Sequence, residues 1–302
     1  MSRKLRLTQL MQLVLPAILL FAAFESTSAQ EVKEERRPLL EIEGNQIFSK
    51  QELLDVVNNQ LDEWAKAGSK YSRDQLDYCI HQMDFFMKSR GYLQGTVVKQ
   101  DFKVAEAGPR LVLTVTEGPL YRVGETTLEG ARLFPSELIL DTIGLRTGDI
   151  ANGKGLSEGL FGRLKTRYSN FGYVQYTAEV QPTFHAKEDA KEGVVDLKIT
   201  IDEGDQFRIH SLKISGAESR VTDLLARELL LRSGDVFDDQ LFHESVNRLN
   251  RTGLVEPIDA EKDVEWTNLQ DKQRRYDRKL NTVEEGPPLL DLLIHVRKAS
   301  HP

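Results

Sequence analysis

The sequence predicts an α+β fold in which a βααββ unit occurs three times in tandem, each unit a three-stranded mixed sheet covered by two helices. Two observations predict this arrangement. One stretch of sequence recurs at a fixed offset, and each copy combines strand-like with helix-like apolar patterns. The chain has 302 residues, of which 40% are hydrophobic and 29% are charged. That composition is typical of an ordinary globular protein, and the length is sufficient for three small domains.

Residues 1–29 have the composition of a secretory signal peptide. Basic residues come first, an apolar run follows at residues 10–24, and small residues follow at 27–29. We expect cleavage before Gln30, a linker over residues 30–37, and export of the mature chain. The alternative is an uncleaved membrane anchor, but the run of about 15 residues is shorter than the roughly 20 that span a bilayer.

The clearest repeat joins residues 115–131 to residues 201–217, which align without a gap at an offset of 86 residues. Both stretches contain Glu-Gly, an aromatic residue followed by Arg, and a closing Gly-Ala. The matching residues are Glu117, Gly118, Tyr121 and Arg122 upstream, and Glu203, Gly204, Phe207 and Arg208 downstream. A Leu-Arg-x-Gly-Asp segment recurs at the same offset, at residues 145–149 and 231–235, and a diverged first copy begins just before Gly44.

These matches predict three domains and one insertion. The domains cover residues 38–118, 119–204 and 205–299. A second landmark, Gly followed by Tyr or Leu, recurs at residues 91, 172 and 253, where we expect a helix to end and a strand to begin. Residues 266–288 are rich in charged and amide side chains, and we expect them to form a surface insertion.

Each copy opens with a strand of β-branched and aromatic residues, and a short helix follows. Ser49 and Glu52 fit a capping box at the start of this helix in copy one, and Ser136 is the expected N-cap in copy two. The apolar stripe of the corresponding helix in copy three is Leu224, Leu225, Leu229 and Leu230.

Apolar residues at spacings of three and four predict the second, longer helix. They are Leu76, Ile80, Met83, Phe86 and Met87 in copy one, and Leu241, Val246 and Leu249 in copy three. Two strands complete each unit. The second strands are expected at residues 96–104, 173–184 and 254–264, and the third strands at residues 110–116, 194–201 and 289–296.

This order of elements, together with the Glu-Gly-x-x-Tyr/Phe-Arg-Val/Ile segment, resembles the POTRA family. POTRA domains are the periplasmic modules of BamA-type outer-membrane assembly factors, of two-partner secretion transporters and of the chloroplast import channel. The resemblance covers about residues 38–299. It implies a non-catalytic periplasmic protein of a diderm bacterium, whose partners are outer-membrane protein clients or an envelope assembly complex. Because the sequence stops at Pro302 without strands for a membrane barrel, channel activity is not part of this expectation.

The resemblance also implies that the second strand of each copy lies at a sheet edge, where an extended client can add as a further strand. Pro182 and Pro257, in or at the end of two of these strands, agree with an edge position. The candidate client-binding residues are Thr96, Val97, Val98, Lys99, Gln100 and Asp101 in copy one, and Gln175, Thr177, Glu179 and Gln181 in copy two. The matching Glu-Gly-x-x-Tyr/Phe-Arg residues are the candidate inter-domain joints, with Arg122 and Arg208 expected to hydrogen-bond between domains.

Other function classes receive little support. The formal net charge of −7 argues against nucleic acid as a partner, and membrane association is expected to be indirect if it occurs. Residues 148–155 nearly match a phosphate-binding loop, but Gly155 stands where Ser or Thr must hold magnesium. Since no zinc-ligand or nucleophile motif occurs, we expect no cofactor, no metal and no catalysis. A membrane-anchored POTRA protein of the cell envelope or division machinery is the main rival.

Overall fold

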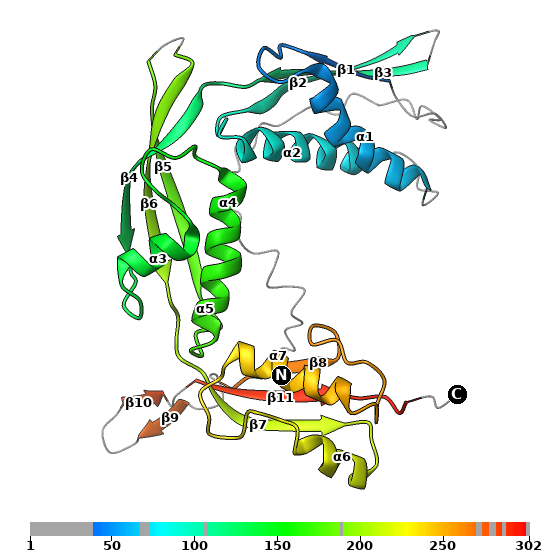
Figure 1. The fold of residues 1–302 in the computed structure, drawn as a ribbon, viewed down its shortest axis with the longest axis vertical. Coiled ribbons are helices and arrows are strands. Elements are labelled where there is room, and N and C mark those ends of the chain that lie inside the picture. Colours follow the sequence, from blue (N-terminus) through cyan, green and yellow to red (C-terminus); the bar gives the residue numbers. More distant parts are fainter. Residues whose placement is uncertain are drawn as a thin grey trace. The chain divides into compact units, whose positions relative to one another are not determined.

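The computed structural model describes residues 39–66, 73–105, 108–187, 190–269, 274–277, 282–285 and 288–299 (Figure 1). The expected signal peptide and linker lie outside these residues. Among the described residues, one compact unit comprises 39–163 and 178–200, and the other comprises 164–177 and 201–299.

Three three-stranded sheets correspond to the three predicted copies. Their strands are β1 (Leu39–Glu43), β2 (Thr96–Ala105) and β3 (Gly108–Thr116); β4 (Leu120–Glu129), β5 (Thr177–His185) and β6 (Glu192–Asp202); and β7 (Arg208–Ser215), β8 (Val264–Asn268) and β11 (Leu289–His295). The spatial orders are β1-β3-β2, β4-β6-β5 and β7-β11-β8. In every sheet the last strand lies in the centre and pairs in parallel with the first, so the second strand lies at an edge. This confirms the predicted fold class.

In the first repeat, α1 (Lys50–Lys66) and α2 (Arg73–Ser89) supply the helical layer. The predicted capping box is confirmed: the Ser49 amide donates to Glu52 Oε2 at 2.9 Å, and the Glu52 amide donates to Ser49 Oγ at 3.2 Å. The buried core combines one face of each helix with the inner face of the sheet. Its members include Ile42, Leu53, Val57, Ile80, Met83, Met87 and Leu113.

In the second repeat, the first helix, α3 (Ser136–Ile143), begins one residue earlier than predicted. Its N-cap is Pro135, which makes no side-chain cap bond, so the prediction that Ser136 is the N-cap was wrong. Proline holds the extended backbone that an N-cap needs, and Ser136 therefore becomes the first helical residue.

The second helix of this repeat is interrupted. It runs through α4 (Gly153–Ser157), the π-helical turn η2 (Glu158–Leu164) and α5 (Lys165–Ser169). Gly159 packs directly against α3, where an added Cβ would lie 2.5 Å from the Ile143 carbonyl oxygen. Arg163 then donates to the carbonyl oxygens of Thr142 and Ile143, both at 2.8 Å, and so satisfies the end of α3.

In the third repeat, the helices are α6 (Ser219–Ala226) and α7 (Asp239–Arg251). The predicted apolar stripes were partly wrong, because Leu224 and Leu241 are 43% and 39% exposed. The buried face of α7 is shifted by one residue relative to Leu241. It consists of Phe242, Ser245, Val246 and Leu249, the spacing of one helix face.

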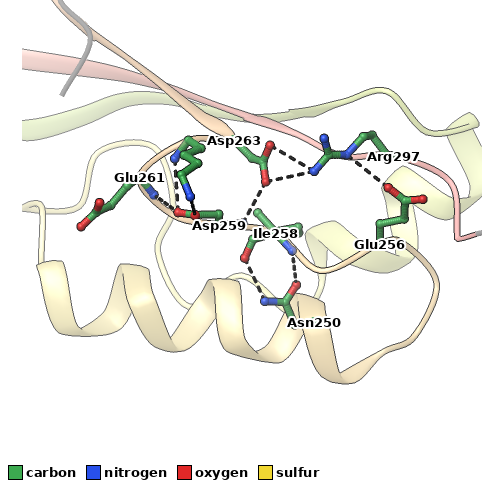
Figure 2. Close-up of polar contacts among 8 residues, drawn as sticks. Asn250, Glu256, Ile258, Asp259, Glu261, Asp263 and Arg297 are labelled. Atoms are coloured by element: carbon green, nitrogen blue, oxygen red, sulfur yellow. Dashed lines mark hydrogen bonds and ion pairs between the residues drawn. The ribbon is translucent and has the colours of Figure 1, made fainter. Parts of the chain in front are cut away.

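The second strand of the third repeat was also placed wrongly. Residues 254–263 form a loop, and β8 starts only at Val264. Figure 2 shows the polar contacts that hold this loop. Asn250 bonds both backbone groups of Ile258, at 2.8 and 3.1 Å, and the Asp259 amide donates to Asp263 Oδ2 at 2.9 Å.

These side chains replace the ladder bonds of a strand, and Pro257, which lies in the loop, has no amide to offer. Arg297 closes the network with ion pairs to Glu256 at 3.3 Å and to Asp263 at 3.4 Å. The predicted surface insertion at residues 266–288 begins too early, because residues 266–268 belong to β8 and Trp266 packs against the apolar core. The rest of the insertion contains a hairpin of β9 (Arg274–Asp277) and β10 (Thr282–Glu285), which was not predicted.

Candidate functional site

The outer sides of the second strands are the candidate binding surfaces. β2 spans ten residues and includes every candidate from Thr96 to Asp101. Among the described strands, only β3 pairs with it. β5 carries Thr177, Glu179 and Gln181 at the edge of the second sheet.

Gln175 does not belong to this edge. It lies in a turn before β5, closed by a bond from the Tyr176 amide to the Tyr173 carbonyl oxygen at 3.3 Å. The apolar and polar residues of this segment do alternate as in a strand. The turn bends the backbone before the alternation can continue into the sheet ladder.

The opposite edge of the second sheet is covered by its own repeat. The Val123 amide donates to the Asp149 carbonyl oxygen at 2.9 Å, and the Gly148 amide donates back to Val123 at 2.8 Å. The third repeat has the equivalent pair: Ile209 donates to Asp235 at 2.9 Å, and Gly234 donates to Ile209 at 2.7 Å. The Leu-Arg-x-Gly-Asp segment therefore occupies part of the first-strand edge in both repeats, a role that the sequence motif did not reveal.

The open edge of β2 has a defined start. Asp84 on α2 accepts the Val97 amide at 2.9 Å and the Thr96 hydroxyl at 2.9 Å. The ladder with β3 shifts register between Val97 and Lys99, so Val98 forms a bulge and its side chain is 58% exposed. Because Asp84 accepts the Val97 amide, the start of the β2 edge is already paired, and the bulge at Val98 follows it.

The open edge of β5 is limited toward its C-terminal end. Pro182 lies inside the strand and has no amide, as the edge assignment predicted. Glu179 and Gln181 are exposed and hydrogen-bond to each other at 3.0 Å along the strand. In the third repeat β8 has only five residues, because the polar loop replaces its beginning. The longest edge without proline is thus β2.

The candidate joint residues lie where the Glu-Gly-x-x-Tyr/Phe-Arg segment meets the recurring glycine that follows the second helix. The Tyr121 amide donates to the carbonyl oxygen of Gly91 at 2.9 Å, and the Phe207 amide donates to Gly172 at 2.9 Å. Both glycines have positive φ, +92° and +86°, which permits the sharp reversal after the helix. The phenol of Tyr121 also donates to Gln94 Oε1 at 2.7 Å, and burial raises the pKa of Tyr121.

The two joint glutamates are buried, each with 5% exposure, but they bond within the chain in different ways. Glu117 accepts three backbone amides of the first repeat, from residues 46–48, at 2.8 to 2.9 Å. Glu203 accepts the phenol of Tyr168 at 2.9 Å. Burial, followed by this bond, raises the pKa of Tyr168 far above its ordinary value. Gly118 and Gly204, which follow the glutamates, have φ of +66° and +65°.

The described side-chain contacts of the two joint arginines lie within their own repeats, whereas bonds between domains were expected. Arg122 donates to the Gly148 carbonyl oxygen at 3.2 Å and pairs with Glu192 at 3.3 Å. Arg208 donates to Gly234 at 3.0 Å. The guanidinium groups thus brace the segment that covers the first strand.

The described residues contain no cluster of three or more His, Cys, Asp or Glu side chains arranged to hold a metal ion. None of the helices that they form has the length and apolar character needed to cross a bilayer. The phosphate-loop-like segment opens α4, where Asn152 Oδ1 accepts the Gly155 amide at 2.8 Å.

Comparison with known proteins identifies similar chains. The family model POTRA, described as "Surface antigen variable number repeat", matches residues 39–118 and 121–204. A putative outer membrane protein assembly factor of Treponema pallidum (strain Nichols) is 27% identical over 73% of this chain and 26% of its own length. The outer membrane protein assembly factor BamA of Neisseria meningitidis serogroup B is 20% identical over 84% of this chain and 31% of its own length. The chain therefore spans less than a third of either relative.

A solved structure has the same fold. The crystal structure of POTRA domains 3–5 of Haemophilus influenzae BamA superposes with a TM-score of 0.57 at 18% identity. The superposition covers 86% of this chain and 95% of that one.

Proposed function

Because this chain belongs to the POTRA family, we propose that it is a non-catalytic, exported binding module that assists outer-membrane protein assembly by adding client strands to its open sheet edges. The carrying observation is the asymmetry of the second and third sheets. The first-strand edge is partly covered by the repeat itself, whereas among the described strands only the central strand pairs with the second strand. The similarity to outer-membrane assembly factors supports the choice of client.

The chemistry of an open edge suits clients of varied sequence. Each added residue pairs through backbone amide and carbonyl groups, so affinity depends little on side-chain identity. β2 offers the strip from Val98 onward, and β5 offers the strip from Thr177 to Gln181. We expect β2 to be the stronger site, because it continues to Ala105 without proline, whereas Pro182 ends the strip of β5.

Photo-crosslinking tests this proposal. A photoreactive residue is placed at Val98 or Thr177 of the full chain, and a urea-unfolded outer-membrane β-barrel protein is added by dilution. The matched control is Val194, an exposed valine on the central strand β6. We expect crosslinks from the two edge positions and few from Val194. Equal yields from all three positions, or no crosslink at either edge, would contradict strand addition.

Export is tested separately. The mass of the mature protein is expected to correspond to a chain that begins at Gln30. An intact N-terminus would instead favour the membrane-anchored envelope protein.

A further inference from the structure

Asn170 belongs to the second repeat, and its side chain contacts the first turn of α7 in the third repeat. The first amides of a helix have no partner within the helix and need an acceptor from elsewhere. Asp238, the N-cap residue, accepts the Leu241 amide at 3.0 Å. The Gln240 amide instead donates to Asn170 Oδ1 at 3.1 Å, and Asn170 is the C-cap residue of α5.

The two residues after Asn170 also bond to the third repeat. The carbonyl oxygen of Phe171 accepts Gln206 Nε2 at 3.0 Å, and that of Gly172 accepts the Phe207 amide at 2.9 Å. Three consecutive residues of the second repeat therefore reach three separate positions of the third. An acceptor held in place on both sides loses little entropy when it caps a neighbouring helix.

The residues on either side of this turn are held by further contacts. The Asn170 amide donates to the Thr166 carbonyl oxygen at 3.0 Å, which continues the α5 ladder. Val174 packs against the apolar core of the third repeat. The backbone at Asn170 thus lies between a helix end and a packed apolar residue.

The first joint has an equivalent backbone bond, from Tyr121 to Gly91, but Ser89 stands where the second joint has Asn170. Ser89 precedes Gly91 as Asn170 precedes Gly172, and its hydroxyl donates to Phe86 of its own helix at 2.7 Å. The cap of α4 comes from Asn152 of the same repeat. Among the described contacts, a side-chain cap between repeats occurs at the second joint alone.

We propose that Asn170 is a trans-repeat helix cap that locks the second helix of repeat two to the second helix of repeat three. The Gln240 amide keeps its acceptor only while both helices are folded and in contact. The lock therefore couples local opening of α7 to the second repeat. At the first joint the described side-chain bond between repeats is instead that of the Tyr121 phenol to Gln94.

Amide exchange on the full chain tests the cap. In Asn170→Ala, we expect exchange of the Gln240 amide to accelerate about five-fold, the usual effect of losing one N-cap. The acceleration should be confined to the first turn of α7. Ser89→Ala is the matched control at the first joint and should leave α7 unchanged. Unchanged Gln240 exchange in Asn170→Ala, or an equal acceleration over all three repeats, overturns the proposal.

Residual dipolar couplings test the lock independently of exchange. In the unmodified chain, the couplings of residues 164–177 and 205–299 should fit a single alignment tensor. Asn170→Ala should require two tensors, and Ser89→Ala should still require one for this pair. A single tensor in Asn170→Ala, or two in the unmodified chain, would show that Asn170 does not lock the joint.

Discussion

Gly159 lies so close to Ile143 that a Cβ at position 159 would stand 2.5 Å from the Ile143 carbonyl oxygen. The obstacle is backbone, so it cannot rotate away as a side chain could. The close packing of α3 on the second helix at this point therefore requires a residue without a Cβ.

We expect Gly159→Ala to lower the free energy of unfolding by about 1–3 kcal/mol through overpacking. Gly162, in the same π-helical turn, has no neighbour within 4 Å of an added Cβ and is the matched control. Gly162→Ala should be neutral or should stabilise by about 0.5–1 kcal/mol, because alanine has the higher helix propensity. Urea unfolding of both variants provides the measurement, and equal effects would contradict the close contact.

Gly172→Ala should destabilise more than Gly234→Ala. Both glycines have positive φ, so both substitutions carry a conformational cost of about 1 kcal/mol. At Gly172 the new Cβ would also lie 2.9 Å from the Phe207 carbonyl oxygen, whereas at Gly234 nothing lies within 4 Å. Thermal unfolding should therefore give a lower midpoint for Gly172→Ala. Equal unfolding midpoints would show that the contact between position 172 and Phe207 adds no destabilisation.

Glu117→Gln should destabilise the chain by about 1–3 kcal/mol, the cost of leaving buried donors poorly paired. The carboxylate accepts three amides, and the amide group of glutamine offers only one acceptor oxygen in its place. Glu158→Gln is the control, because its ion pair with Lys154 is exposed and contributes little. Denaturant titration compares the two. Similar losses would show that the Glu117 carboxylate is not required as an acceptor.

The capping box of α1 predicts a pH effect. The bonds of Glu52 with Ser49, first to its side chain and then to its backbone, lower the pKa of the Glu52 carboxyl. A lowered folded-state pKa contributes stability above the ordinary value of 4.5, and that contribution is lost as the pH falls through the folded pKa. In Ser49→Ala we expect the pKa of Glu52 to move up toward its ordinary value, as followed by carboxyl NMR titration. Ser136→Ala, at a helix start without a side-chain cap, should leave the Glu52 titration unchanged.

The repeat, the fold class and the capping box could be predicted because they depend on local or self-similar sequence. Ser49 and Glu52 are three residues apart, and the copies align over short stretches without gaps. The loop that replaces the start of β8 could not be predicted in the same way. It depends on Asn250 and Arg297, which come from α7 and from the chain after β11.

In the candidate site too, features that depend on residues distant in the sequence could not be predicted. The resemblance placed β2 and β5 at sheet edges, but the contact of Asp84 with Val97 and the covering of the first strands appear only in the folded chain. The strand pattern around Gln175 was misleading, because alternation of side chains does not report where the backbone turns. The lock at Asn170 had no signal in the sequence, since its neighbour in the fold is Gln240.

The main-chain bond between Gly91 and Tyr121, repeated between Gly172 and Phe207, affects how repeats can be added to or removed from such a chain. A connection made of backbone atoms needs only a glycine on one side and a compatible strand on the other. Each junction adds one side-chain match to this backbone bond: Gln94 accepts the Tyr121 phenol at the first, and Asn170 accepts the Gln240 amide at the second. Duplicating or deleting a whole unit would therefore require an amide side chain at the matching place of the preceding unit.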